Sequence, residues 1–216
     1  MVGHGINFAV MSLEPWLERD RMEAGCDEAG RGCLAGPVTA AAVILSPDFA
    51  KELIAEGELD DSKKLNRTTR NRLRQRIEKC ALAWSVAHIE PAEIDRINIL
   101  QASFKAMRQA AHTLSKAPSF LLIDGNRFVT DEHLPAFACV VKGDGKYASI
   151  AAASVLAKTH RDEYMQGLSS TFPGYGWASN AGYPTQAHRE AIRRLGVTEH
   201  HRRSFRQLPE QLPLFG

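Results

Sequence analysis

The chain has 216 residues and a formal net charge of +2 at neutral pH, which is enough length for one well-buried core without requiring two domains. That charge neither demands nor excludes a polyanionic partner, and no apolar run approaches the roughly 18 residues of a membrane span. The four cysteines form no CxxC pair and have no histidine at zinc-finger spacing, so we expect no structural zinc site and a reducing, cytoplasmic setting.

The chain is predicted to form one domain with an extension at each end. Residues 1–20 are an N-terminal extension of unknown role, in which Met11 is an alternative start. Residues 21–208 carry the hydrophobic periodicity of the domain, and residues 209–216 form a proline-broken tail. No pattern indicates an obligate subunit interface, so we expect a monomer.

The first half of the domain is predicted to begin as a hairpin. One strand ends at Cys26, a glycine-rich turn follows, and an apolar strand runs over residues 38–45. Asp61 or Ser62 then caps a basic helix that continues to about residue 80.

The second half alternates strands and helices. Residues 84–89 alternate as a third strand, and a long helix runs from Pro91 to about Leu114. Apolar runs at 120–123 and 136–141 are the fourth and fifth strands. Helices at 149–158 and 185–195 follow, the second closed by a glycine. The pattern predicts an α/β fold, a mixed five-stranded sheet flanked by helices with a helical C-terminal portion.

Four acids occupy positions near predicted strand ends. Asp27 and Glu28 follow the first strand, Asp124 ends the fourth, and Asp144 comes soon after the fifth. Side chains at such ends converge on one crevice of an α/β sheet. Hard carboxylate oxygens select Mg²⁺ or Mn²⁺, and two such ions can drive hydrolysis of a phosphodiester. The alternative for any one of them is a turn or cap residue, because an aspartate readily bonds nearby amides.

The segment Gly30-Arg31-Gly32 directly follows the first acids. Glycines let a backbone approach a ligand closely, and Arg31 offers a forked contact to a phosphate. A dinucleotide-binding loop is the alternative, but the glycine spacing does not give GxGxxG. The segment therefore favours contact with a sugar or phosphate.

Two basic runs leave their role open. Residues 63–76 hold seven Lys or Arg and no acid, and residues 189–206 hold six Arg against two Glu. Each run is either a solvated helix face or a surface for phosphates. Asp162 lies in an apparent helix that continues past the run at 149–158, and it is expected to form a structural ion pair. His200 and His201 are adjacent among arginines, so no metal pair is expected from them.

Several segments together resemble ribonuclease HII, the type 2 ribonuclease H family, over residues 24–205. They are Gly25-Cys26-Asp27-Glu28-Ala29-Gly30-Arg31-Gly32, Asp61-Ser62-Lys63-Lys64-Leu65, Leu122-Ile123-Asp124-Gly125-Asn126, Lys142-Gly143-Asp144, Ala151-Ala152-Ala153-Ser154, Gly182-Tyr183-Pro184-Thr185 and His200-His201-Arg202-Arg203-Ser204-Phe205. The resemblance implies a ribonuclease H-like fold. It also implies an endonuclease that cuts the RNA-containing strand of RNA–DNA hybrids, or of DNA duplexes with embedded ribonucleotides.

The resemblance also implies roles for particular residues. Asp27, Glu28, Asp124 and Asp144 become metal-binding catalytic carboxylates, with two Mg²⁺ or Mn²⁺ ions in the substrate complex. Gly30-Arg31-Gly32 reads the ribose 2′-hydroxyl, Tyr183 packs on the neighbouring sugar, and Lys63 and Lys64 contact phosphates. The cut falls 5′ of a ribonucleotide and leaves a 3′-hydroxyl and a 5′-phosphate, as ribonucleotide excision repair requires. A noncatalytic duplex-binding module and another nuclease of the same fold remain as alternatives.

The C-terminal tail has two interpretations. Its apolar residues either dock on the parent domain or serve as a short peptide for a partner. The tail resembles the peptide by which bacterial replication and repair enzymes bind the DNA sliding clamp. In that interpretation Gln211 fixes the register, and Leu212, Leu214 and Phe215 enter an apolar pocket.

Overall fold

The computed structural model describes residues 13–59 and 66–210. Its sheet has the strand order β3-β2-β1-β4-β5. The bounds are β1 Glu23–Ala29, β2 Val38–Ile44, β3 Ala83–Ile89, β4 Phe120–Asp124 and β5 Phe137–Val140. β2 pairs antiparallel with β1 and β3, whereas β4 pairs parallel with β1 and β5. The predicted mixed five-stranded sheet is therefore confirmed.

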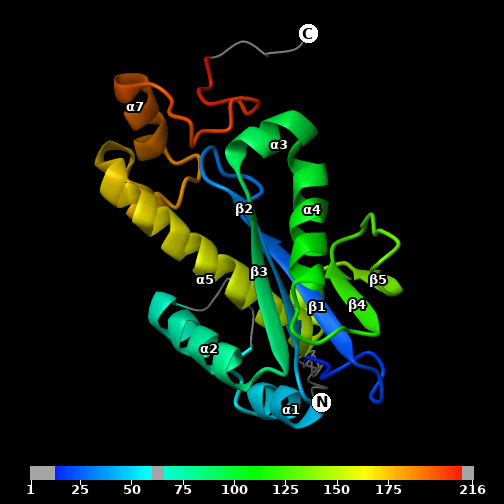
Figure 1. Ribbon diagram of the computed structural model, residues 1–216. Helices are drawn as coiled ribbons and strands as arrows, with labels where there is room; N and C mark the ends of the chain where they lie inside the picture. The colour runs from blue at the N-terminus through cyan, green and yellow to red at the C-terminus, as the bar shows by residue number, and fades with distance from the viewer. Residues whose placement is uncertain (1–12, 60–65, 211–216) are drawn as a thin grey trace, which may run out of the picture.

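Helices cover both faces of this sheet (Figure 1). They are α1 Pro47–Ala55, α2 Arg67–Cys80, α3 Pro91–Ile97, α4 Ile99–His112, α5 Ala148–Thr171, α6 Trp177–Asn180 and α7 Gln186–Leu195, with 3-10 helices η1 Gly143–Gly145 and η2 Pro173–Tyr175. α4 shares one apolar core with the sheet, while α1, α2 and α5 share a second core on the other face. This division explains why the interior strand β2 is buried along its whole length.

The C-terminal portion is helical, as predicted, and has a small core of its own. Trp177 is fully buried there, stacked on Tyr175, and Ile192 of α7 packs into the same cluster. α7 is capped by Thr185, whose hydroxyl accepts from the amide of His188, and it ends before Gly196. This portion lies against the far end of α5 (Figure 1), next to the segment that follows β1.

Some boundaries differ from the sequence-based prediction. β1 does not end at Cys26 but continues to Ala29, because β2 goes on pairing with it as far as Thr39. The basic helix is capped by Asn66, whose side chain accepts from an amide of the first turn. The predicted caps Asp61 and Ser62 lie outside the described residues.

The long helix predicted from Pro91 to Leu114 is two helices. Asn98 between them has φ +66°, a left-handed value that ends α3, and its side chain accepts from the amides of Leu100 and Gln101 to start α4. Asparagine tolerates this conformation better than most residues. The hydrophobic period continues across the break, so it did not reveal the break. Helix α1 was also not predicted.

No helix within the described residues is long and apolar enough to cross a membrane.

Candidate active site

Asp27 and Asp124 lie side by side at the edge where β1 and β4 stop pairing. The last parallel pair is Cys26 with Ile123, so each aspartate is the next residue on its own strand. The Asp27 carboxylate accepts from the hydroxyl of Ser154 on α5. Side chains on a strand alternate between the two faces, and this contact places Asp27 on the face that α5 covers.

Glu28 is the third acid of the same cluster. Its side chain is 8% exposed and accepts from Arg31 Nη1 at 3.2 Å. Burial and the charges of Glu28 and Asp124 raise the pKa of Asp27 well above its usual range, although the Ser154 hydrogen bond opposes the shift. Burial also raises the pKa of Glu28, against the opposing effect of Arg31, and Asp124 adds to the increase. Negative charge is therefore costly in this cluster, and a bound cation would relieve that cost.

The fourth predicted acid, Asp144, is buried in η1, the turn between β5 and α5. The neighbouring Gly143 donates its amide to Asp124 Oδ1 at 2.7 Å, which fixes that carboxylate against the turn. A Cβ at Gly143 would lie 2.5 Å from Ile150 Cδ1, so the end of that side chain would have to move to admit a larger residue in η1. The fold thus brings the β4 and η1 segments together at the predicted edge.

In this structure the carboxylates are not arranged as a complete set of cation ligands. Within residues 13–59 and 66–210, no three His, Cys, Asp or Glu side chains have the arrangement of a metal site. The set nevertheless fits a hard divalent ion, because its donors are carboxylate oxygens and Asp27, Glu28 and Asp124 lie close enough to repel one another. Residues that repel one another without a cation are expected to draw together around one.

The segment Gly30-Arg31-Gly32, here called the glycine loop, follows directly from β1. Gly30 has φ +91°, and a Cβ there would lie 2.0 Å from Arg161 Nε. Gly32 is the opposite case, since a Cβ at that position would meet nothing within 4 Å. Arg31 is about half exposed beside Glu28. The loop therefore has an open outer surface at Gly32 and a tightly packed inner contact at Gly30.

Tyr183 lies next to the glycine loop, although more than 150 residues separate them in sequence. The residue is 36% exposed, and Lys158 Nζ lies 5.4 Å from the centroid of its ring. Trp177 Nε1 donates to His188 Nε2 at 2.9 Å, and His188 Nδ1 donates to the Tyr183 carbonyl at 2.9 Å. These hydrogen bonds fix the backbone of Tyr183, and its partly exposed ring lies at the rim of the site.

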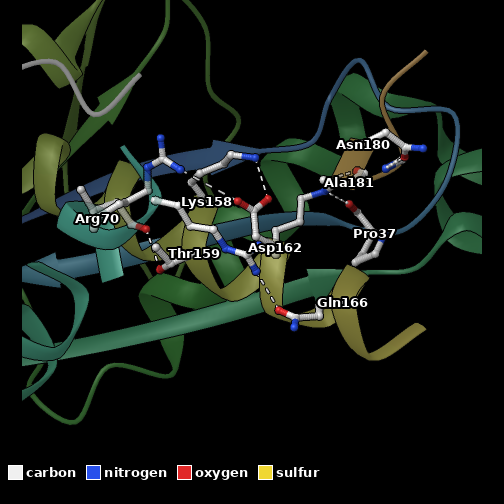
Figure 2. A network of polar contacts seen from close by, with 12 residues as sticks. Pro37, Arg70, Lys158, Thr159, Asp162, Gln166, Asn180 and Ala181 are labelled. Atoms are coloured by element: carbon white, nitrogen blue, oxygen red, sulfur yellow. Dashed lines mark hydrogen bonds and ion pairs between the residues drawn. The ribbon is translucent and has the colours of Figure 1, made fainter. Parts of the chain in front are cut away.

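Cations gather beside this tyrosine. A cavity of about 170 Å³ is lined by Tyr183, Lys158, Arg67 and Arg70, among others. Lys158 donates to Asp162 Oδ1 at 2.6 Å (Figure 2), which confirms the structural ion pair expected for Asp162. One acid against three cations leaves this cavity with a positive excess.

Much of the two basic runs has other partners. Arg72 pairs with Glu58, Arg74 with Glu78 and Glu163, Arg76 with Glu52, Glu56 and Glu58, and Arg193 with Glu210, while Arg202 is fully buried. These arginines stabilise the fold or are neutralised by nearby acids. Lys63 and Lys64 lie outside the described residues.

Sequence reasoning did not assign roles to Ser154 or Lys158. Ser154 belongs to the alanine-rich run of α5, where the only available signal was a polar residue among small ones. Lys158 follows Ser154 by four residues, one helical turn along the same face. This spacing of four residues was the signal that could have identified both residues, because it places them on the one face of α5 that lines the site.

Comparisons with known proteins point to one family. A family model described as Ribonuclease HII matches residues 24–208. Ribonuclease HII of Parabacteroides distasonis is 57% identical over 202 residues, which covers 94% of this chain and 98% of the relative. The Bacteroides fragilis protein is 55% identical over 204 residues, with 94% and 98% covered.

Solved structures show the same fold. A chain in the PCNA:RNase HII complex from Archaeoglobus fulgidus superposes with a TM-score of 0.72 at 25% identity, covering 88% of this chain and 98% of that one. Bst-RNase HIII in complex with Mn²⁺ gives a TM-score of 0.70 at 20% identity, covering 92% and 68%. The matched range includes the carboxylates, the glycine loop and Tyr183. The chain therefore belongs to the ribonuclease HII family.

Proposed function

We propose that this protein is an endonuclease that hydrolyses the RNA-containing strand of RNA–DNA hybrids and of DNA duplexes with embedded ribonucleotides. The observation that carries the proposal is the meeting of Asp27, Glu28 and Asp124 at one sheet edge beside the glycine loop. Relatives at 55–57% identity named Ribonuclease HII support it. The cut is proposed to fall 5′ of a ribonucleotide, leaving a 3′-hydroxyl and a 5′-phosphate, and to serve ribonucleotide excision repair.

The acids are proposed to hold Mg²⁺ or Mn²⁺, two ions in the substrate complex, with Asp144 as the fourth ligand. Ions bound there would supply an activated water and stabilise the leaving oxygen. The Mn²⁺ complex of Bst-RNase HIII supports the choice of metal. Ser154 and the Gly143 amide orient the two aspartates, one from α5 and one from η1.

The glycine loop and Tyr183 are proposed to select the nucleotide. The 2′-hydroxyl is the group that distinguishes RNA from DNA at a given sugar, and open space at Gly32 lets backbone approach it. Arg31 reaches a phosphate when it leaves Glu28, to which it bonds at 3.2 Å. Lys158 and the proposed contacts Lys63 and Lys64 bind the sugar–phosphate backbone.

A cleavage assay on a continuous RNA–DNA hybrid tests the proposal. With Mg²⁺ or Mn²⁺ we expect internal cuts in the RNA strand, and none with EDTA. The upstream products should prime a DNA polymerase, which requires a 3′-hydroxyl. Equal cutting of an all-DNA duplex would contradict the proposal, and binding without cutting would favour the noncatalytic alternative.

Changes at Tyr183 separate its ring from its hydroxyl. Tyr183→Phe keeps the ring that contacts the sugar and should cost about threefold or less in kcat/KM, whereas Tyr183→Ala should cost on the order of tenfold. Steady-state cleavage of a duplex with one ribonucleotide measures both. Equal losses in the two variants would instead assign the effect to the hydroxyl, which lies next to the Cys33 thiol.

The tail is proposed to bind a DNA sliding clamp. At Glu210 the chain still contacts the domain, because Arg193 donates to both of its carboxylate oxygens, at 2.7 and 3.0 Å. The proposed anchors Gln211, Leu212, Leu214 and Phe215 lie outside the described residues, just beyond this ion pair. The archaeal structure titled as a PCNA:RNase HII complex supports a clamp as the class of partner.

Truncation after Glu210 tests this role. We expect unchanged cleavage of free oligonucleotides and an unchanged melting temperature, with loss of binding to the sliding clamp in a pull-down or by calorimetry. Tethering would act by raising the local concentration of the enzyme on new DNA. A fall of several degrees in the melting temperature, or no clamp binding by the full chain, would favour docking of the tail on its own domain.

A further inference from the structure

Two fully buried arginines lie behind the glycine loop. They are Arg161 on α5 and Arg202 in the segment after α7, both with no exposed surface. Neither forms an ion pair with a carboxylate in the part of the chain that the structure describes; both donate to backbone carbonyls instead. Buried arginines are usually paired with acids, so this arrangement calls for an explanation.

Arg161 joins the segment after the glycine loop to the turn before Tyr183. Its guanidinium donates to the carbonyls of Pro37 at 2.9 Å, Ala35 at 3.0 Å and Ala181 at 2.8 Å. Figure 2 shows Pro37 and Ala181 side by side at the end of this network, although they come from distant parts of the sequence. The same side chain fills the space that a Cβ at Gly30 would need.

Arg202 acts on the glycine loop itself. Its Nε donates to the Gly36 carbonyl at 3.0 Å and its Nη1 to the Arg31 carbonyl at 2.9 Å. The Arg31 carbonyl and the Gly32 amide belong to one peptide unit. A cation bound to the carbonyl polarises that unit and makes its N–H a stronger donor. Burial lowers the pKa of Arg202 to about 10, so the side chain is still charged at neutral pH.

The Gly32 amide is well placed to use this polarisation. Gly32 is exposed, a Cβ there would meet nothing within 4 Å, and its N–H has no hydrogen-bond partner among the described residues. Charges inside a protein are screened by salt less than surface charges. The positive electrostatic potentials of Arg161 and Arg202 therefore add at the exposed N–H of Gly32, beside the catalytic acids.

We propose that Arg161 and Arg202 are positioning residues for ribonucleotide recognition: Arg161 sets the distance between the glycine loop and Tyr183, and Arg202 strengthens the Gly32 amide as a donor to the sugar–phosphate group at the cleavage site. This inference rests on the proposed function. It predicts that changing either arginine lowers cleavage of a duplex with one ribonucleotide more than cleavage of a continuous hybrid. The single ribonucleotide can be bound in only one register, whereas the hybrid offers a 2′-hydroxyl at every position of the RNA strand.

The test compares these two substrates in Arg161→Lys and Arg202→Lys. Lysine keeps the charge, but its donors sit on a single nitrogen and cannot reproduce the planar fork by which arginine reaches carbonyls that lie apart. We expect kcat/KM to fall at least tenfold more on the single-ribonucleotide duplex than on the continuous hybrid. Arg96→Lys, at an exposed arginine of α3 paired with Glu93, is the matched control and should behave as wild type. Equal losses on both substrates would show a merely structural role and overturn the proposal.

A second measurement needs no variant and no activity. Positive potential speeds the hydroxide-catalysed exchange of a nearby amide hydrogen, so in the wild-type protein without metal the Gly32 N–H should exchange faster than in an unstructured peptide. Exchange slower than in the peptide would contradict the role of Arg202. If the wild type cleaves neither duplex, the proposed function fails, and the exchange rate still decides whether Gly32 is polarised.

Discussion

Replacing Asp124 with Asn is expected to reduce turnover by about a hundred- to a thousandfold while duplex binding is kept or strengthened. The side chain keeps its shape and its place beside the Gly143 amide, but the site loses one of the charges proposed to hold the divalent ions. Stabilisation by such ions amounts to several kcal/mol, and each 1.4 kcal/mol is a factor of ten in rate. Binding is expected to survive because one source of repulsion toward phosphates is removed.

Single-turnover cleavage gives the rate, and fluorescence anisotropy in EDTA gives the affinity. Asp131→Asn is the control, since Asp131 lies in a surface loop and accepts from His112 at 2.9 Å, away from the cluster. We expect that variant to cleave at the wild-type rate. A near-normal rate for Asp124→Asn would remove Asp124 from the mechanism.

A matched pair of glycine variants should separate the packing of the glycine loop from its role in recognition. Gly30→Ala forces a Cβ onto Arg161 at a left-handed φ, so we expect both stability and cleavage to fall. Strain of this kind costs about 1–3 kcal/mol, or several degrees in melting temperature for a chain of this size. Gly32→Ala meets open space and should leave the melting temperature unchanged.

Cleavage by Gly32→Ala is the informative result. A methyl group at the surface proposed to face the sugar should lower kcat/KM on a ribonucleotide-containing duplex by at least tenfold in a fully folded protein. Thermal unfolding and steady-state cleavage of the same preparations measure the two effects. Wild-type cleavage by Gly32→Ala would mean that the substrate does not approach the backbone there.

The sheet and the acids could be predicted because their signals are local. The strands β2, β4 and β5 appear as short apolar runs, and Asp124 directly follows one of them, so its place at a sheet edge needed no tertiary information. The end of β1 was misplaced because pairing with β2 extends it past Cys26 to Ala29. The break at Asn98 was missed because one left-handed residue does not disturb the hydrophobic period.

The cations could not be assigned from sequence, because their partners are distant along the chain. Arg202 appeared to belong to a basic surface run, yet it is buried against the carbonyls of Arg31 and Gly36, more than 160 residues away. Arg76 belonged to a run without acids, but the turn after α1 brings Glu58 to it. Charge counted along a sequence therefore overestimated the surface available to phosphates.

The most direct test of the central claim is to map where the wild-type protein cuts a DNA duplex that contains one ribonucleotide. With Mg²⁺ or Mn²⁺, sequencing-gel analysis should show one cut, on the 5′ side of the ribonucleotide. That cut should vanish when the same nucleotide carries 2′-deoxyribose or when EDTA is present. Cutting that persists without the 2′-hydroxyl, or that falls at unrelated positions, would contradict the assignment of the glycine loop and the carboxylates to one ribonucleotide-reading active site.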